Sequence, residues 1–221
     1  MQMTRGGKMK IGASFLGAKN IPNVLKKLNV TNVDYIHIDV MDGKYVKRKT
    51  MPINELINIP YYTRKRLDVH LMVLKPLKLI DDLATLNVEF INVHLDIKDN
   101  LDKVIEKCKK YGIKVGIAVN PNQEIESVYP YLDKIDLVLV MSVVPGLPGQ
   151  EFIPESIPKI KKLREEITSR NLKTLINVDG GVNFLNAKDL CDADILVSGS
   201  TILKSDDFQD TITKLRKCAT K

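Results

Sequence analysis

The sequence predicts a single (β/α)₈ barrel, a TIM barrel of the α/β class, on three observations. Eight apolar runs rich in Val, Ile and Leu recur at a regular spacing through the 221 residues. Amphipathic segments lie between them, as expected when helices cover a parallel sheet. No linker or low-complexity stretch interrupts the repeats, so we expect one domain over residues 1–221, with residues 1–9 as a ragged N-terminal extension.

The expected strands are continuous apolar runs because parallel strands of this kind are buried on both faces. In chain order they cover residues 10–16, 33–41, 66–73, 90–96, 114–120, 136–143, 174–180 and 194–200. An open, doubly wound sheet is the alternative. Such sheets usually have fewer strands, and no GxGxxG motif follows the first run here, which counts against a dinucleotide site.

The expected helices carry apolar residues at helical spacing. They cover residues 20–28, 76–86, 100–112, 124–132, 157–170, 186–191 and 207–219. Asp99-Asn100 and Asp206-Asp207 are start signals for two of them. Residues 53–62 show a less regular helical pattern, which Pro60 interrupts.

Charge and composition limit the expected partners. The formal net charge is +7, but the lysines are mixed with acidic residues, aromatic residues make up 5%, and there is no Trp. This favours a solvated, lysine-rich surface that helps to attract an anionic substrate over a nucleic-acid interface. No stretch approaches the ~20 apolar residues of a membrane helix, so we expect no membrane partner.

The N-terminus and the cysteines indicate a cytoplasmic protein. The short apolar run IGASFLGA (11–18) turns polar at once, so we expect a first strand there and no signal peptide. Cys108, Cys191 and Cys218 are widely spaced, odd in number and match no metal-binding pattern. We expect them to be reduced thiols.

Polar and methionine side chains gather toward the C-terminal ends of the expected strands. Residues two apart share one face of a strand. The second and third strands therefore present His37, Asp39 and Met41, and Asp68, His70 and Met72, respectively. Ser14, Met141 and Asp179 lie near the ends of the first, sixth and seventh strands. In a parallel barrel these ends meet at one mouth, where barrel enzymes have their active sites.

Two imidazoles and two carboxylates in that mouth suit a divalent metal such as zinc, iron, manganese or cobalt. The four residues are His37, Asp39, His70 and Asp179. Taken singly, a strand histidine is more often a hydrogen-bonded core residue, and a strand-end aspartate more often a cap. We expect Asp42, which precedes Gly43, to be a turn residue, and His94 to be structural or to support a ligand residue.

Glycines mark two further features. VDGGV (178–182) and VSGS (197–200) end the seventh and eighth strands, where barrels often bind phosphate. Either alone is as well explained by a turn or by close packing, but the two together favour phosphate. VVPGLPGQEF (143–152) follows the sixth strand and is either a mobile lid or an ordinary surface loop.

Five motifs in order carry a family resemblance. HIDVMDG (37–43), DVHLMV (68–73), MSVVPGLPGQEFIPE (141–155), VDGGV and SGS have the order and spacing seen in the ribulose-phosphate 3-epimerase family. From Lys10 to Arg216 the chain resembles that family. The motifs are moderately specific one by one and highly specific together.

The resemblance implies a metal-dependent isomerase of the pentose phosphate pathway. By match, His37, Asp39, His70 and Asp179 would bind a divalent metal, often zinc, with iron, manganese or cobalt as alternatives. Asp39 and Asp179 would be the catalytic acid/base pair on opposite faces of C3 of ribulose 5-phosphate. The substrate would be a phosphorylated ketose, and the chain would form a homo-oligomer.

The resemblance also implies a set of substrate-binding residues. The strand-one serine and the methionines that cover the planar intermediate would be Ser14, Met41, Met72 and Met141. The mobile loop would contribute Gly146, Leu147, Pro148 and Gly149. The phosphate group would be bound by Gly180, Gly181, Gly199 and Ser200.

The chain departs from the family pattern at its rim. Lys47 and Arg48 replace a usual Pro-Asn pair, Val144 a usual Asn and Pro148 a usual Gly, and residues 13–16 read ASFL in place of Pro-Ser-Ile-Leu. None of these changes removes a proposed metal ligand. They leave open two alternatives: an epimerase of a longer ketose phosphate such as allulose 6-phosphate, and a non-catalytic sugar-phosphate-binding barrel.

Overall fold

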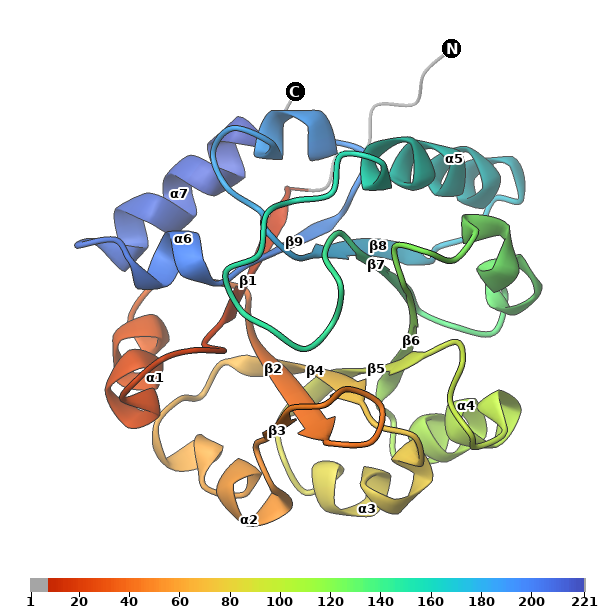
Figure 1. Cartoon of the computed structure of the whole chain (residues 1–221), viewed down its shortest axis with the longest axis horizontal. Coiled ribbons are helices and arrows are strands. Elements are labelled where there is room, and N and C mark those ends of the chain that lie inside the picture. The colour runs from red at the N-terminus through yellow and green to blue at the C-terminus, as the bar shows by residue number, and fades with distance from the viewer. Residues whose placement is uncertain (1–7, 221) are drawn as a thin grey trace.

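Eight parallel strands close into a barrel in the computed structural model, which describes residues 8–220 (Figure 1). The strands are β1 (Lys10–Ser14), β2 (Tyr35–Asp42), β4 (Arg66–Met72), β5 (Val88–His94), β6 (Lys114–Val119), β7 (Leu137–Met141), β8 (Leu175–Asp179) and β9 (Ile195–Ser198). Each pairs with its neighbours in parallel, and the pairing of β1 with β2 closes the ring. The predicted (β/α)₈ barrel is confirmed.

The strand register places the polar residues of neighbouring strands beside one another. On β2 and β4, His37 pairs with Asp68 and Asp39 with His70. Ser14 of β1 is the register partner of His37, on the other side of β2. Because all these strands run the same way, the chemically active side chains lie near the C-terminal mouth of the barrel.

A short ninth strand was not predicted. β3 (Lys49–Thr50) pairs antiparallel with the end of β2, through Met41 and Asp42. Two residues have no detectable alternation, so a periodicity argument misses such a strand. The Thr50 hydroxyl donates to the carbonyl of Asp39 over 2.7 Å, which holds this segment against the site.

Helices form an outer ring around the strands (Figure 1). The α-helices are α1 (Ile21–Asn29), α2 (Ile53–Leu56), α3 (Ile80–Leu83), α4 (Leu101–Lys110), α5 (Ser156–Ser169), α6 (Ser200–Leu203) and α7 (Phe208–Cys218). The 3₁₀ helices are η1 (Ile59–Tyr61), η2 (Pro76–Lys78), η3 (Ile125–Tyr131) and η4 (Ala187–Leu190).

Several expected helices are shorter or tighter than their patterns suggested. Residues 124–132 contain the 3₁₀ helix η3 in place of the expected α-helix, and Pro130 within it has no N–H to donate. Residues 76–86 divide into η2 and α3, and 186–191 contain only the four-residue η4. Ser200, expected at the end of the last strand, is the first residue of α6.

Helix α4 shows how the sequence sets its own limits. The Asn100 side chain accepts from the Lys103 N–H, which caps the helix at the expected start signal. Val104, Ile105 and Cys108 form its buried face. The helix ends before Gly112, which adopts a φ of +69° that other residues avoid.

The barrel interior has an apolar floor beneath the polar mouth. The inner cluster consists of Tyr35, Phe90, Ala118, Leu137, Leu139, Met141, Val143 and Ile195. The rings of Tyr35 and Phe90 meet edge to face, with centroids 5.6 Å apart. This packing closes the lower end of the barrel and leaves the C-terminal end for the site.

The expected N-terminal extension falls mostly outside the described part of the chain, which begins at Lys8. Met9 is buried, and its carbonyl accepts from the Arg216 guanidinium over 3.0 Å. Across residues 8–220, no helix is long and apolar enough to cross a bilayer. Cys108, Cys191 and Cys218 are free cysteines.

Candidate active site

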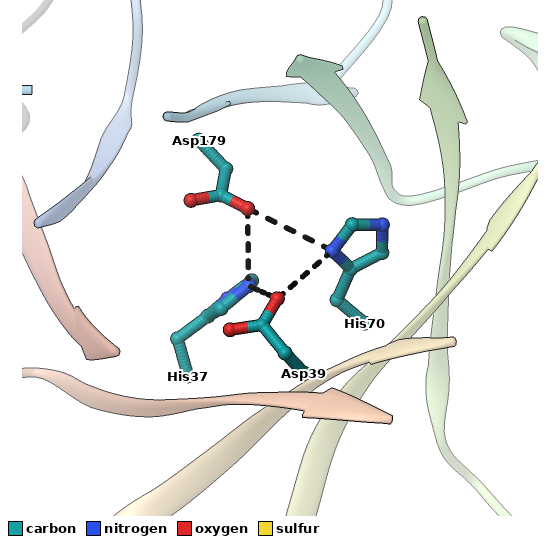
Figure 2. A group of neighbouring side chains, drawn as sticks. All are labelled: His37, Asp39, His70 and Asp179. Atoms are coloured by element: carbon teal, nitrogen blue, oxygen red, sulfur yellow. Dashed lines mark ion pairs between the residues drawn. The ribbon is translucent and has the colours of Figure 1, made fainter. Parts of the chain in front are cut away.

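Four side chains converge at the barrel mouth, as Figure 2 shows. They are His37 and Asp39 of β2, His70 of β4 and Asp179 of β8. One potential ligand atom of each lies within 4.8 Å of the others. These are the four residues that the sequence predicts as metal ligands.

The spacing of these atoms fits a single cation. Nε2 of His37 lies 3.6 Å from Asp39 Oδ1 and 3.4 Å from Asp179 Oδ2. Nδ1 of His70 lies 3.3 Å and 3.7 Å from the same two oxygens. A tetrahedral zinc about 2.1 Å from each ligand requires ligand atoms about 3.4 Å apart.

Two buried nitrogen atoms also point to a cation. Nε2 of His37 and Nδ1 of His70 have no hydrogen-bond partner among the described residues. Buried polar atoms are nearly always partnered, so such a pair requires an explanation. Both atoms face the two carboxylates (Figure 2), and a cation at their centre would provide the missing partner.

His37 is oriented from behind by Asp68. Its Nδ1 atom lies 2.8 Å from Oδ2 of this fully buried carboxylate. Asp68 also accepts from the side-chain amides of Asn92, at 2.6 Å, and Asn177, at 3.0 Å. With its Nδ1–H donated to Asp68, the neutral form of His37 carries its Nε2 lone pair toward the centre of the cluster.

Sequence reasoning gave no role to this supporting network. The strand pattern predicts that Asp68 shares a face with His70, but it does not show that His37 is its partner on the neighbouring strand. Asn92 and Asn177 were not singled out at all. Buried amides inside apolar strands were the signal that could have found them, because such groups need partners.

Charges inside the cluster shift the pKa values of its members. Burial alone would raise the pKa of Asp39, but the adjacent His37 and His70 rings hold it well below its usual range. Burial opposes protonation of His37, yet Asp68 and Asp179 raise its pKa well above the ordinary value. The Asp39 carboxylate is therefore ionised at neutral pH.

Ser14 braces Asp39 from β1. Its hydroxyl donates to Asp39 Oδ2 over 2.9 Å, while Oδ1 faces the two histidines. The backbone N–H of Leu16 donates in turn to the serine oxygen. Ser14, expected to bind substrate, thus contacts one of the proposed catalytic carboxylates and also lines the cavity.

A cavity with about 570 Å³ of empty space, its open mouth included, lies directly above the cluster. Both carboxylates line it, and so does every expected substrate-binding residue except Met41: Ser14, Met72, Met141, Gly146, Leu147, Pro148, Gly149, Gly180, Gly181, Gly199 and Ser200. Met41 is 2% exposed and lies beside Met72 in the sheet. It is not among the residues that line the cavity.

Two glycines bring the backbone close at one end of the cavity. Gly180 and Gly181 have φ values of +122° and +64°. A Cβ atom on Gly180 would lie 2.5 Å from Val143 Cγ2, and one on Gly181 would lie 2.5 Å from the Phe152 backbone nitrogen. These positions accept only glycine without a local rearrangement.

Comparison with known proteins agrees with the motifs. Residues 10–203 match the model of the ribulose-phosphate 3 epimerase family. The chain belongs to this family. It is 38% identical to ribulose-phosphate 3-epimerase of Helicobacter pylori, covering 94% of this chain and 97% of that protein. It is 34% identical to the Bacillus subtilis enzyme of the same name, covering 94% and 98%.

Solved structures support the fold alone. The barrel is similar to 3-hexulose-6-phosphate synthase from Salmonella typhimurium, with a TM-score of 0.67, 17% identity, and coverage of 96% and 98% of the two chains. It is similar to the tryptophan synthase alpha subunit of Campylobacter jejuni, with a TM-score of 0.66, 15% identity and 96% coverage of both.

Membership of the epimerase family makes the protein an isomerase.

The loop of this epimerase between β7 and α5 crosses the barrel mouth (Figure 1). The loop packs closely against its neighbours at two points. A Cβ atom added to Gly146 would lie 3.3 Å from Cβ of Val46, and one added to Gly17 would lie 3.3 Å from Cβ of Pro148. The Gln150 amide donates to the carbonyls of Val144 and Leu147, which braces the loop internally. The loop therefore lies over the cavity, where a lid would lie.

The departures from the family pattern lie around that mouth. Val144 is 63% exposed on the crossing loop. Lys47 is exposed, and Arg48 is half-buried in a second cleft that shares Leu16 and Asp39 with the main cavity. These positions surround the ligand set without entering it.

Proposed function

We propose that this epimerase interconverts D-ribulose 5-phosphate and D-xylulose 5-phosphate by inverting C3. Asp39 and Asp179 are the acid/base pair, and His37, Asp39, His70 and Asp179 hold a divalent cation. The observation that carries the proposal is that carboxylates from β2 and β8 reach the same two histidine nitrogens inside one cavity. Family membership supports the reaction type.

The reaction requires removal of a weakly acidic proton. The C3 hydrogen lies next to a ketone, and when it leaves, negative charge moves onto the ketone oxygen to give an enediolate. A divalent cation bound at the cluster supplies positive charge for that oxygen. A carboxylate alone is too weak a base to remove this proton at a useful rate.

Inversion requires two proton-transfer groups on opposite faces. Asp39 extends from β2 and Asp179 from β8, on different walls of the barrel (Figure 2). Whichever carboxylate is ionised removes the C3 proton from its own face. The other, protonated, returns a proton to the opposite face, so that the configuration changes.

Methionines suit the walls around the planar intermediate. Met72 and Met141 line the cavity and are 1% and 2% exposed. Their thioethers are polarizable and compete weakly for hydrogen bonds. They exclude water from the developing charge without offering a proton to it.

The phosphate group is assigned to the glycine-rich end of the cavity. Gly180, Gly181, Gly199 and Ser200 lie there, and side chains are absent from three of these four positions. Backbone N–H groups are strong ligands for phosphate oxygens. Residues 146–149 form the lid that closes over the bound substrate.

Zinc is the proposed cation, with iron, manganese and cobalt as alternatives. Imidazole nitrogen and carboxylate oxygen together suit all four ions, and a four-residue set near tetrahedral spacing is typical of zinc. The structure supports a metal site, and elemental analysis of purified protein will identify the ion.

A longer ketose phosphate is the second candidate substrate. The cleft beside Asp39, which Arg48 lines, is the observation that favours it. Comparison of kcat/KM for pentulose 5-phosphates and hexulose 6-phosphates decides between them. If kcat/KM is higher for the hexulose 6-phosphate than for the pentulose 5-phosphate, the hexulose phosphate replaces ribulose 5-phosphate as the proposed substrate.

The main experiment measures exchange and conversion together. Metal-free protein is supplied in turn with Zn²⁺, Mn²⁺, Fe²⁺ and Co²⁺ and incubated with ribulose 5-phosphate in D₂O. We expect xylulose 5-phosphate to form with deuterium at C3. Absence of both product and deuterium with every ion would exclude the proposed reaction and leave a non-catalytic binder.

A substitution tests the acid/base pair. Asp179→Asn should abolish turnover while circular dichroism shows an intact fold. Retained activity would disprove the assigned role of Asp179. Retention of zinc by the variant, measured separately, distinguishes loss of the proton-transfer group from loss of the metal.

A further inference from the structure

His94, at the C-terminal end of β5, contacts one of the four cluster residues directly. Its Nε2 atom lies 2.8 Å from Nε2 of His70. Both rings are completely buried, with centroids 4.9 Å apart. The opposite ring nitrogen of His70, Nδ1, is the atom that faces Asp39 and Asp179. His94 is therefore located behind His70, as Asp68 is located behind His37.

A single proton lies between the two Nε2 atoms of this hydrogen bond. If this proton is bonded to Nε2 of His70, then Nδ1 of the neutral His70 ring carries a lone pair toward the cluster. If it belongs to His94, then neutral His70 carries its proton on Nδ1 and cannot bind a cation there. The tautomer of His94 thus determines whether His70 can be a ligand.

Tyr45 holds His94 in place from the other side. Its ring lies over His94, with centroids 4.4 Å apart and planes inclined by 31°. The Tyr45 hydroxyl donates to Asp96 over 2.8 Å and accepts from the Asn120 amide over 2.7 Å. These bonds join the loop after β2 to the ends of β5 and β6, on either side of the histidine.

We propose that His94 positions His70 for metal binding by accepting its Nε2–H, and that Tyr45 holds the His94 ring in the orientation this requires. This inference rests on the proposed metal site. The two histidine ligands then accept support from different groups. The carboxylate of Asp68 contacts His37, and the neutral imidazole of His94 contacts His70.

The surroundings of His94 favour the accepting, neutral form. The groups that face the ring are His70 on one side and the uncharged Tyr45 on the other. No ion pair of His94 with a carboxylate is present among residues 8–220.

The test compares two substitutions at one position. His94→Leu removes the acceptor and keeps an apolar side chain, whereas His94→Gln offers an amide oxygen in its place. Zinc affinity is measured by competition with a chelator, starting from metal-free protein. We expect His94→Leu to weaken zinc binding by about 10- to 100-fold, a typical effect of removing such a supporting group, and His94→Gln to recover part of the loss.

Histidine nitrogen NMR provides a readout that a merely structural role would not move. The chain has three histidines, so selective ¹⁵N labelling gives a simple spectrum. In zinc-loaded protein we expect His37 to carry its proton on Nδ1 and His70 on Nε2. A His70 that is protonated on Nδ1, or that binds zinc through Nε2, would overturn the proposal.

Tyr45 is tested against a matched tyrosine. Tyr45→Phe removes two hydrogen bonds beside the cluster, and Tyr111→Phe removes a hydroxyl bond to Asp81 on the surface. Zinc affinity should fall in the first variant and remain unchanged in the second. Equal zinc affinity in wild type, Tyr45→Phe and both His94 variants would refute the inference.

The outcome for the wild type separates this inference from the proposed function. If wild-type protein binds none of the four ions, the proposed metal site itself fails. If wild type binds zinc and His94→Leu binds it equally well, only the positioning role fails. Should His94→Leu not fold, His94→Gln and Tyr45→Phe still decide the question through the NMR tautomer of His70.

Discussion

The Nδ1 atom of His37 lies 2.8 Å from Oδ2 of Asp68, and this contact fixes which nitrogen of His37 faces the cluster. The two residues are register partners on β2 and β4. An ionised carboxylate can only accept a hydrogen bond, so Nδ1 must be the donor. In the neutral ring the Nε2 lone pair then points to the centre of the cluster, between Asp39 and Asp179.

Asp68→Asn tests this relationship. An asparagine can turn its NH₂ group toward Nδ1, which would then accept and leave the proton on Nε2, where a cation should bind. We expect zinc affinity to fall by about 10- to 100-fold, measured by chelator competition. The control is Asp81→Asn, which removes the surface carboxylate that accepts from Lys107 and Tyr111. This variant should bind zinc with wild-type affinity.

Removal of the Asp68 charge should also lower stability. Asp68 is fully buried and accepts from two asparagine amides as well as from His37. Loss of part of such a network costs about 1–3 kcal/mol, measured as the free energy of urea unfolding of metal-free protein. Unchanged zinc affinity in a folded Asp68→Asn variant would contradict the orienting role.

Ser14→Ala tests the brace on Asp39. Without the 2.9 Å bond to Oδ2, the carboxylate is free to rotate away from its catalytic orientation. Hydrogen bonds to charged groups contribute about 1.5–3 kcal/mol, so we expect kcat to fall roughly 10-fold or more. Steady-state kinetics on zinc-loaded protein measures this.

The control for Ser14 is Ser205→Ala, which removes a serine bond to the carbonyl of Ile202, outside the cavity lining. It should leave kcat unchanged. A Ser14→Ala enzyme with wild-type kcat would show that the Asp39 orientation does not depend on this hydroxyl.

Two glycines with nearly equal φ values distinguish the energetic cost of an unfavourable backbone conformation from the cost of a steric clash. Gly181 and Gly112 have φ values of +64° and +69°. A Cβ on Gly181 would approach the Phe152 nitrogen to 2.5 Å, whereas nothing lies within 4 Å of one on Gly112. Gly112→Ala should therefore cost only the left-handed conformation, about 1–2 kcal/mol of unfolding free energy.

Gly181→Ala should cost more than Gly112→Ala and should also raise KM for the sugar phosphate, because Gly181 lines the cavity and Gly112 does not. Urea unfolding and steady-state kinetics measure the two effects. Similar losses of stability in both variants, with KM unchanged, would argue against a tight backbone approach at Gly181.

The cluster could be predicted because its residues interrupt a strong pattern. His37, Asp39 and His70 stand at alternate positions in strands that are otherwise apolar, and Asp179 ends another such strand. Parallel strand order then brings the C-terminal ends together whatever the exact register. The eight strands followed from the same continuous apolar runs.

Which ligand each supporting residue contacts could not be predicted, because this depends on cross-strand neighbours. That Asp68 lies beside His37, or His94 beside His70, follows from the register and from side-chain direction, which one sequence does not specify. Periodicity also did not predict the 3₁₀ type of η3, which contains Pro130, or the two-residue strand β3, whose Thr50 hydroxyl donates to the Asp39 carbonyl.

Cys108 provides a test of burial that is independent of the active site. Burial raises the pKa of its thiol to about 12, with Lys107 opposing and Asp136 adding to the shift. Because the thiolate is the reactive form, Cys108 should be unreactive at pH 8, where almost none is ionised. Cys218 is exposed and Cys191 is partly exposed.

A disulfide reagent at pH 8 should therefore label two thiols in folded protein and three in urea. The Cys191→Ser/Cys218→Ser double variant should label none until it unfolds. Rapid labelling of that folded variant would show that the packing of α4 against the barrel is looser than described.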